Sequence, residues 1–435
     1  MTKQIQDTIR DSHPSFADVQ VGKSCDLREK AQGRCLKNAH RTFEQGIQCV
    51  QVNSMNALVS LQDTVMVIHS PLGCSGCAAF GAIDRLNVYK HHRGRDDAPD
   101  SHVISSALGE KEVILGGEKR LEETIQKAVE RYNPKIVFIL SSCAAAIIGD
   151  DIDAVAERME KKYRRLEGRD ILFAPVHCEG FKSRNHATGY DLALATLQNY
   201  VIRKACPPKQ KGLINLFATH SLSWADQEEM KRMLKAIGSQ STNRWLRAIA
   251  KLAGKEKEAE AFIESESAAV AEEVEKIKKK TDGLRACLTA GTGRGFAAAT
   301  LIGDYGMKLL CMHTPYYDEA YIDDFKRLEE LHGSDFLVNI ADMQPYEQVN
   351  LLKKYKPDVF IGMSNWVSRL GIPSLHILDS KRPTFGYRGV LYLGRKIEDA
   401  LDNNNFNKNL SQFSKNTYRE EWYKKDAFSY LQLPE

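Results

Sequence analysis

The chain has 435 residues, which is enough for a large core and, at roughly 150 residues per domain, for two or three domains. Its 61 basic and 57 acidic residues nearly cancel, so no surface directed at nucleic acid is predicted. The mean hydropathy of −0.41 and the lack of a long uncharged apolar run argue against a membrane span. The polar start lacks a signal-peptide core, which predicts a cytoplasmic protein.

Residues 1–60 are predicted to form a polar N-terminal arm, and 61–206 a first α/β domain. Apolar runs in this domain read as buried strands, and helical patterns lie between them. The strands are expected at 64–69, 135–141 and 170–176, and the helices over 118–132 and from the aspartates at 150–153 onward. Strands that alternate with helices indicate βαβ units and a parallel sheet.

A Pro- and Lys-rich stretch at 204–212 indicates a linker to a second, smaller α/β and helical domain over 207–282. That domain is expected to contain a strand at 213–218 and an almost wholly helical run over 242–280. A third α/β domain over 283–400 is predicted from strand patterns, and 401–435 form a polar tail. The strands of the third domain are expected at 284–290, 307–312, 336–340, 359–362 and 375–378.

Cysteines fall in four short stretches, two of which directly follow predicted strands. Without a secretory signal, ten cysteines favour thiols that are kept for chemistry over disulfides. Parallel strands place their carboxyl ends, and hence the thiols that follow them, at one edge of a sheet. Soft thiolates favour an iron–sulfur cluster or zinc. The four stretches are Cys49, the segment 69–77 (HSPLGCSGC), Ser142-Cys143, and the segment 177–181 (HCEGF).

Zinc is the weaker of the two metal interpretations. A site built on Cys74 and Cys77 needs a second pair of ligands, and Cys25 and Cys35 are poorly spaced to supply it. Cys77 is either a fourth ligand or a small buried residue behind its loop. For the remaining cysteines we expect packed structural roles; they are Cys178, Cys206, Cys287 and Cys311.

Together these stretches resemble the alpha subunit of the nitrogenase catalytic component. The resemblance is close over about 45–200 and looser over 284–400, where a KPDVFIG run and a Gly-Ile-Pro turn fall in family order. It implies a fold of three Rossmann-like parallel-sheet α/β domains around a central crevice. The motifs that carry it are Cys49, HSPLGC, Leu115-Gly-Gly-Glu-Lys119, Cys143 followed by Ile148-Gly-Asp-Asp151, and PVHCEGF.

The resemblance implies that Cys49, Cys74 and Cys143 hold an iron–sulfur cluster of the 4Fe–4S or 8Fe–7S type at an interface with a partner subunit. That partner would be a homologous beta-type subunit in an α2β2 heterotetramer, although a homodimer stays open. The chain has no GxxxxGK[ST] loop, so ATP would be hydrolysed by a separate iron protein that delivers the electrons.

The pocket that holds the second, larger cofactor in nitrogenases is altered in this chain. Phe385 stands at the position of the family's histidine ligand, and Ala82 at that of an arginine. His186 and Tyr190 match a glutamine and a histidine near that cofactor, and a family segment of roughly forty residues is missing after Gly238. Whether a second cofactor is bound, and whether His186 or another residue ligates it, stays open.

The loop Gly291-Thr-Gly293-Arg-Gly295 follows a predicted strand and precedes a helix, so it either binds an anion or allows close packing. Gly73 and Gly293 are the predicted backbone contacts to a cofactor. Arg294 and Arg388 are predicted to face one crevice, either to neutralise an anionic cluster or substrate or as ordinary surface arginines. With His186 and Tyr190 they form the predicted catalytic group.

We therefore expect a nitrogenase-like, ATP-dependent reductase subunit that acts on a small substrate other than dinitrogen. A methylthio-alkane, cleaved at a carbon–sulfur bond, is the first candidate, and a tetrapyrrole is the second. Two other classes stay open: a scaffold on which the nitrogenase cofactor is assembled, and a cluster-free structural or sensor protein.

Overall fold

A computed structural model describes most of the chain, and its contacts divide the chain into two units. One unit, here called the thiol-bearing unit, spans 48–220; the other, the C-terminal unit, combines 1–47 with 221–435. Within the described part of the chain, no helix is long and apolar enough to cross a membrane. The described residues are 20–33, 35–37, 49–59, 61, 63–76, 101–166, 168–183, 188–202, 224–236, 240–289, 291–340, 345–362, 366–377, 379, 381–415 and 419–424.

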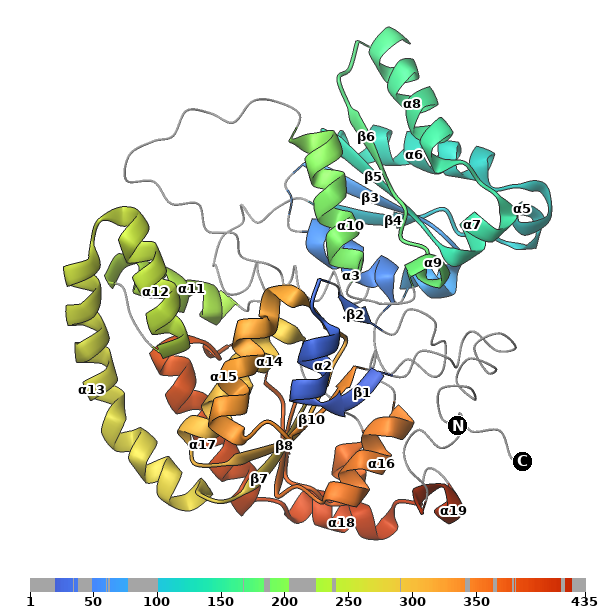
Figure 1. The fold of residues 1–435 in the computed structure, drawn as a ribbon. Helices are drawn as coiled ribbons and strands as arrows, with labels where there is room; N and C mark the ends of the chain where they lie inside the picture. Colours follow the sequence, from blue (N-terminus) through green and yellow to red (C-terminus); the bar gives the residue numbers. More distant parts are fainter. Residues whose placement is uncertain are drawn as a thin grey trace. The chain divides into compact units, whose positions relative to one another are not determined.

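The thiol-bearing unit is built on a fully parallel sheet of four strands (Figure 1). Strands β3 and β5 are almost entirely buried because helices cover both faces, which explains why they appear in the sequence as continuous apolar runs. The register places His69 opposite Ser141 at the carboxyl ends of two neighbouring strands. In sheet order the strands are β4 (Ser101–Ser105), β3 (Thr64–His69), β5 (Ile136–Ser141) and β6 (Leu172–Val176).

Two helices pack on each face of this sheet. Helix α3 (Val50–Leu58) and α10 (Thr188–Thr196) share one hydrophobic cluster with the sheet, and α6 (Glu118–Tyr132) and α8 (Ile152–Leu166) share the other. Helix α6 ends at left-handed Asn133, directly before a proline, as expected from the sequence. Shorter helical segments complete the described part of the unit; they are α5 (Glu110–Leu115), α7 (Cys143–Ile148), α9 (Gly180–Ser183) and the π-helix η2 (Leu197–Val201).

The C-terminal unit contains a six-stranded sheet that is parallel except for its first edge strand, β1. Strand β1 comes from the N-terminal segment and pairs antiparallel with β10, so it covers an edge that would otherwise be open. In sheet order the strands are β1 (Gln20–Lys23), β10 (Leu337–Ile340), β8 (Lys308–Thr314), β7 (Arg285–Thr289), β11 (Val359–Gly362) and β12 (Ser374–Leu375).

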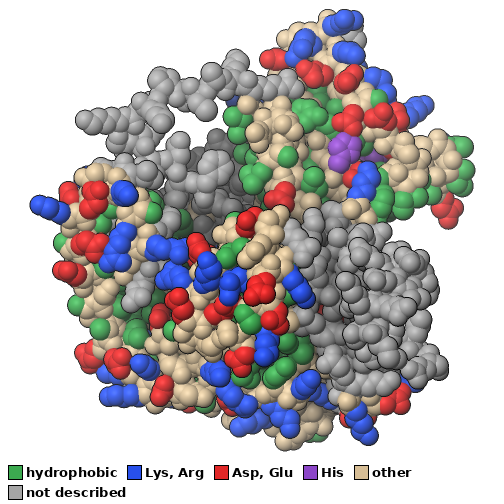
Figure 2. Space-filling view, in the orientation of Figure 1, with side chains coloured by type: hydrophobic (Ala, Val, Ile, Leu, Met, Phe, Trp, Pro, Cys, Tyr) green, Lys and Arg blue, Asp and Glu red, His purple; other side chains and the backbone are tan. Residues whose placement is uncertain are grey.

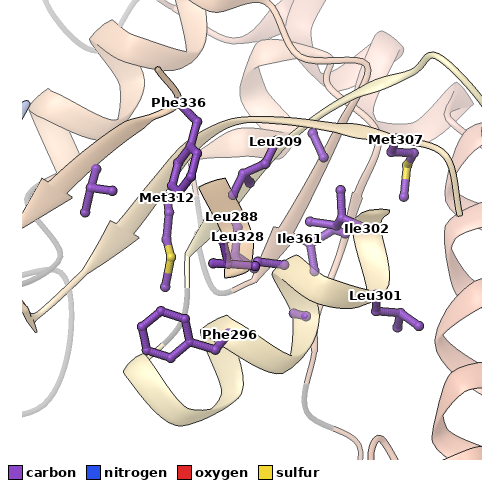
Figure 3. Packing of buried hydrophobic residues seen from close by; sticks show 14 of the residues in the cluster. Leu288, Phe296, Leu301, Ile302, Met307, Leu309, Met312, Leu328, Phe336 and Ile361 are labelled. Carbon is purple, nitrogen blue, oxygen red and sulfur yellow. The ribbon is translucent and has the colours of Figure 1, made fainter. Parts of the chain in front are cut away.

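The main core of this unit lies between that sheet and helix α14 (Thr292–Asp304). Phe296 and Ile302 of the helix pack with Leu288 and Met312 of the sheet, and Figure 3 shows their side chains converging. The other elements of the unit are α2 (Ser24–Lys30), β2 (Leu36–Lys37), α11 (Trp224–Ala236), α12 (Gln240–Ala253), α13 (Glu256–Thr281), β9 (Tyr316–Tyr317), η3 (Glu319–Tyr321), α15 (Ile322–His332), α16 (Pro345–Tyr355), η4 (Val367–Leu370), α17 (Gly386–Asp402), α18 (Asn405–Phe413) and α19 (Glu420–Tyr423).

The expected α/β class with parallel sheets is confirmed, and the predicted strands are present where the structure describes them. Three details differ. The N-terminal arm contributes two strands and a helix to the C-terminal unit, the helical run over 242–280 breaks at left-handed Gly254, and the last predicted strand is limited to Ser374–Leu375. The predicted linker at 204–212 and strand at 213–218 lie outside the described residues, so the division into three α/β domains stays a prediction.

A candidate thiol-lined metal centre

The three cysteines predicted as cluster ligands lie at the carboxyl edge of the parallel sheet in the thiol-bearing unit. Cys143 is the first residue of α7, directly after β5, and Cys74 lies in the helical turn at 72–76 that follows β3. Cys49 is the N-cap residue of α3, and all three side chains are exposed. Strands β3 and β5 are the pair at which the strand order reverses direction, and open α/β sheets bind ligands there.

A buried hydrogen bond ties the segment of Cys49 to that of Cys143. The side-chain amide of Gln51 donates to the main-chain oxygen of Ser141 at 2.9 Å. Gln51 is two residues beyond Cys49, and Ser141 is two residues before Cys143. Because both partners are buried, this bond restricts how far the two thiols can separate.

Cys178 lies behind this edge and has a structural role. Its side chain is buried, and its thiol donates to the same Ser141 oxygen at 3.1 Å. Burial, together with the nearby negative charge of Glu179 and Cys49, raises the pKa of the Cys178 thiol well above its usual value.

Glu179 places a fixed negative charge next to the thiol edge. Burial alone raises its pKa, but hydrogen bonds with His177 and Ser141 outweigh that effect and lower the pKa to about 2. The next residue, Gly180, approaches closely, because a Cβ placed there would lie 3.7 Å from the sulfur of Cys143.

The turn that carries Cys74 is held from beneath by a row of serine hydroxyls. Ser75 is buried, and its hydroxyl lies 2.6 Å from those of both Ser70 and Ser105. The main-chain nitrogen of Ser75 donates to the carbonyl oxygen of Pro71. These bonds connect the ends of β3 and β4, so Cys74 projects from a braced turn.

His69 joins the same edge to the loop before α8. Its imidazole lies 2.8 Å from a carboxylate oxygen of Asp150 and 3.0 Å from the hydroxyl of Ser106. Burial lowers the pKa of His69, and Asp150 opposes that effect. Gly117 donates its main-chain N–H to Asp150, and a Cβ on Gly117 would lie 2.6 Å from that carboxylate. The site therefore requires glycine at 117.

Of the other residues predicted near this centre, Cys77 and His186 lie outside the described part of the chain. Tyr190 is half-buried on α10, and its hydroxyl donates to Asn53 of α3 at 3.4 Å. Gly73 lies in the exposed turn beside Cys74. The structure therefore places Cys49, Cys74, Cys143 and Gly73 in segments at the carboxyl edge of one sheet, and Tyr190 in the packing between two helices.

Gly293, Arg294 and Arg388 belong to the C-terminal unit. Gly293 lies in the first turn of α14, and the guanidinium of Arg294 contacts Asp226 at 3.1 Å and the hydroxyl of Thr384 at 3.0 Å. Arg388 lies 3.7 Å from Glu229 and is largely exposed. The two acidic partners are one turn apart on α11, so both arginines contact that helix, and their facing one crevice stays a prediction.

The three thiols are soft donors of the kind that iron–sulfur clusters use. Among the residues that the structure describes, no three His, Cys, Asp or Glu side chains are grouped closely enough to hold one metal ion. An iron–sulfur cluster is several atoms wide and takes thiolate ligands from separate segments of a chain. These three cysteines come from three such segments. The exposed sulfurs and the braced backbone around them fit such a group.

Large apolar side chains surround the thiol edge and remain exposed. Ile114 of α5 is 79% exposed and Ile147 of α7 is 74% exposed. Figure 2 shows hydrophobic side chains at the surface where α5 and α7 lie in Figure 1. Contiguous exposed apolar surface is typical of a protein–protein contact. We call this set the apolar rim; it consists of Leu72, Val113, Ile114, Leu115, Ile147 and Phe181.

Sequence reasoning missed the residues that support the thiols. Gln51 is an ordinary polar residue in the sequence, and Asp150 was noted only within a family motif and at a helix start. Only the pairing of distant segments reveals their partners. A weak signal was present for Gly117, since a second glycine directly before a helix suggests a close approach.

Comparison with known proteins identifies a family whose members this chain resembles. The family model described as "Nitrogenase component 1 type Oxidoreductase" matches residues 49–240 and 235–402. The nitrogenase iron-molybdenum cofactor biosynthesis protein NifE of Methanococcus maripaludis is 25% identical over 429 residues, which cover 84% of this chain and 86% of that protein. The nitrogenase molybdenum-iron protein alpha chain of Methanosarcina barkeri is 24% identical, over 78% of this chain and 83% of the relative.

A solved structure gives the same picture of the fold. The structure of nitrogenase Cp1 at pH 5 matches with a TM-score of 0.67 and 18% identity, over 90% of this chain and 97% of that chain. At this level of identity the match shows a shared fold.

Proposed function

The chain belongs to the family of nitrogenase component 1 type oxidoreductases, and from that premise we propose that it is an electron-transferring subunit which binds an iron–sulfur cluster through Cys49, Cys74 and Cys143. The observation that supports this proposal is that three exposed thiols, from three separate segments, lie at the carboxyl edge of one parallel sheet. A 4Fe–4S or 8Fe–7S group bound there supplies one-electron transfer at low potential.

The chain's own residues hold and shield that position. Gln51 and the serine row fix the segments that carry the thiols, and Glu179 and Asp150 supply fixed charge and hydrogen bonding behind them. The apolar rim would exclude water once a second subunit covers it. We propose that this partner is a homologous beta-type subunit, in an α2β2 assembly, and that an iron-protein ATPase delivers the electrons.

The substrate that we propose is a small molecule other than dinitrogen, and methylthio-alkanes are the first class to test. The support is in the sequence: Phe385, which has no metal-binding atom, stands where the family has a histidine ligand. The family model also matches in two pieces that meet at 235–240, where the predicted deletion lies. In this proposal His186 and Tyr190 are the substrate-binding candidates of the thiol-bearing unit, and Gly293, Arg294 and Arg388 are those of the C-terminal unit.

The test is iron and sulfide analysis with EPR on anaerobically purified protein, alone and together with its co-purified partner. We expect about four irons per alpha–beta pair if only a 4Fe–4S relay is present, and far more if a second cofactor is bound. Cys74→Ala and Cys143→Ala should each remove the signal, while Cys287→Ala, in the core of the other unit, should keep it. An unchanged signal in the first two variants would refute the ligand assignment.

A second candidate is a scaffold on which the nitrogenase cofactor is assembled. It is favoured by relatives of comparable identity that carry the name of a cofactor biosynthesis protein, from Methanococcus maripaludis and Rippkaea orientalis. The two functions differ in turnover. A reductase consumes electrons continuously when a substrate is supplied, whereas a scaffold releases a loaded cofactor to an acceptor protein and shows no substrate-dependent electron consumption.

A further inference from the structure

The C-terminal unit contains a surface pocket at the edge of its sheet opposite to the Gly291–Gly295 loop. The pocket has a volume of about 390 Å³. Lys356 and Pro357, which line it, directly precede β11, and Ile372 precedes β12, so the pocket lies at the amino ends of these strands. The 291–295 loop instead follows the carboxyl end of β7, which is parallel to β11. The pocket therefore lies at the end of these strands opposite to the 291–295 loop.

Positive charge dominates the lining of this pocket. It contains four cationic side chains and no acidic one: Lys353, Lys356, Arg369 and Lys415. The acid next to Pro357 in the sequence, Asp358, is paired with Arg285 at 3.2 Å and does not line the pocket. Like charges gathered around one cavity raise the local concentration of anions, because each cation adds to the same field.

The wall behind these charges is apolar and rigid. Val349 and Leu352 of α16 are buried beneath the pocket, and Leu370 and Ile372 complete the apolar surface. The guanidinium of Arg369 lies over the ring of Trp366, 4.8 Å from its centre, which fixes the direction of that charge.

Helix α18 forms the opposite wall and is attached by side-chain hydrogen bonds. Asn407 donates to the main-chain oxygen of Ile372 at 2.8 Å, and Asn404 donates to that of Gly371 at 2.9 Å. Ser411 of this helix and Ser414, its C-cap residue, line the pocket. These side chains attach one wall to the main chain of the other wall, so the pocket does not need a ligand to form.

We propose that this pocket binds a nucleoside di- or triphosphate. The volume lies within the range of roughly 300–1,000 Å³ that is usual for small-molecule sites. Several cations match a polyphosphate, and the apolar wall matches a base and sugar, which inorganic phosphate lacks. The chain has no P-loop, so recognition would rest on side-chain charges and an apolar surface. The inference does not depend on the thiol centre.

The test is isothermal titration calorimetry of the purified full-length protein with ADP at low salt. Inorganic phosphate and citrate serve as comparison probes. Lys356→Glu combined with Arg369→Glu should weaken ADP binding at least tenfold. The matched control is Lys257→Glu combined with Lys279→Glu, which changes the net charge equally at exposed positions of α13 and should leave binding unchanged.

Ser414→Trp provides a variant that leaves the charge unaltered. Its bulky side chain would fill the pocket from the C-cap of α18. It should also abolish binding, and its circular dichroism spectrum should match that of the wild type. Three results would overturn the proposal: no saturable binding of ADP to the wild type, equal weakening in the control pair, or binding of phosphate or citrate as tight as that of ADP.

Discussion

The side-chain amide of Gln51 donates a hydrogen bond to the main-chain oxygen of Ser141, and this single bond connects the segments of two of the three candidate ligands. Cys49 and Cys143 each lie two residues from one of its partners. The buried thiol of Cys178 donates to the same oxygen, so that oxygen accepts two bonds. The backbone of β5 and one glutamine on α3 therefore hold the segments of Cys49 and Cys143 next to each other.

Replacing Gln51 should affect both stability and the bound cluster. In Gln51→Leu the Ser141 oxygen loses one donor, and we expect a loss of about 1–3 kcal/mol in the free energy of unfolding. The iron content and the EPR signal should also fall, because the segment of Cys49 is no longer held. The matched control is Ser54→Ala, which removes a buried bond to Gly189 from the same helix. Urea unfolding and iron analysis would show a stability loss in both variants and an iron loss in Gln51→Leu alone.

Gly117→Ala should destabilise the protein by crowding the His69–Asp150 pair. The added Cβ would lie 2.6 Å from the Asp150 carboxylate and 2.7 Å from Leu108, and overpacking of this kind costs about 1–3 kcal/mol. Alanine can adopt the φ of −102° found at Gly117, so a loss of stability would have a steric cause. Gly76→Ala meets no atom within 4 Å and serves as the control. Equal thermal midpoints for Gly117→Ala and the wild type would contradict the close approach.

Arg294 and Asp226 should prove to be coupled in a double-mutant cycle. Asp226 is fully buried, and it accepts hydrogen bonds from Arg294 and from the backbone N–H of Thr384. Arg294→Gln leaves that carboxylate without its cation, so we expect the free energy of unfolding to drop by roughly 1–3 kcal/mol. The double variant with Asp226→Asn should lose less than the sum of the single changes. Strict additivity would mean that the pair does not interact.

His332 should make the protein less stable as the pH falls below its ordinary pKa of about 6.5. One ring nitrogen donates to the carbonyl oxygen of Ala299, and the other accepts from the N–H of Leu309, so the neutral ring is fully paired. Burial lowers the pKa of His332, despite the bond to Ala299, which raises it. The unfolded chain therefore binds the proton first on acidification, and stability present above pH 6.5 is lost. In His332→Gln, urea unfolding between pH 7 and pH 5 should show a shallower dependence on pH.

The apolar rim should be required for assembly with the partner subunit. Ile114→Asp combined with Ile147→Asp places two charges on exposed apolar positions, which should weaken association and leave the fold intact. Phe413→Asp is the control, since Phe413 is 84% exposed on α18 in the C-terminal unit. Size-exclusion chromatography of the co-expressed pair would detect separation. Unchanged co-elution of the Ile114/Ile147 variant would exclude the rim as the contact.

The strand pattern of this fold was predictable because buried parallel strands are apolar throughout. The runs at 64–69 and 136–141 are read directly from the sequence, and so is the consequence that Cys74 and Cys143 follow neighbouring strand ends. Helix α6 was predictable from its period and from the Asn-Pro at its end.

Features that depend on distant pairing were not predictable. Strand β1 has four residues, Gln20–Lys23, and its apolar content is too low to indicate a strand; it forms because the edge of β10 is available. The partners of Gln51 and His69 are 90 and 81 residues away, and no local pattern connects them. The ion pair of Arg294 was missed for the same reason, because Asp226 lies 68 residues earlier.

The pairing of β1 with β10 has a consequence for biosynthesis. Residues 20–23 leave the ribosome early, but β10 is made more than 300 residues later, so the N-terminal strand must wait for most of the chain before it has a partner. The sheet of the thiol-bearing unit lies entirely between these two strands in the sequence and is complete once 172–176 have emerged. Nascent chains stalled far enough beyond residue 220 for this unit to have left the ribosome should therefore already protect it from protease, while residues 20–33, which include the unpaired strand β1, are cleaved.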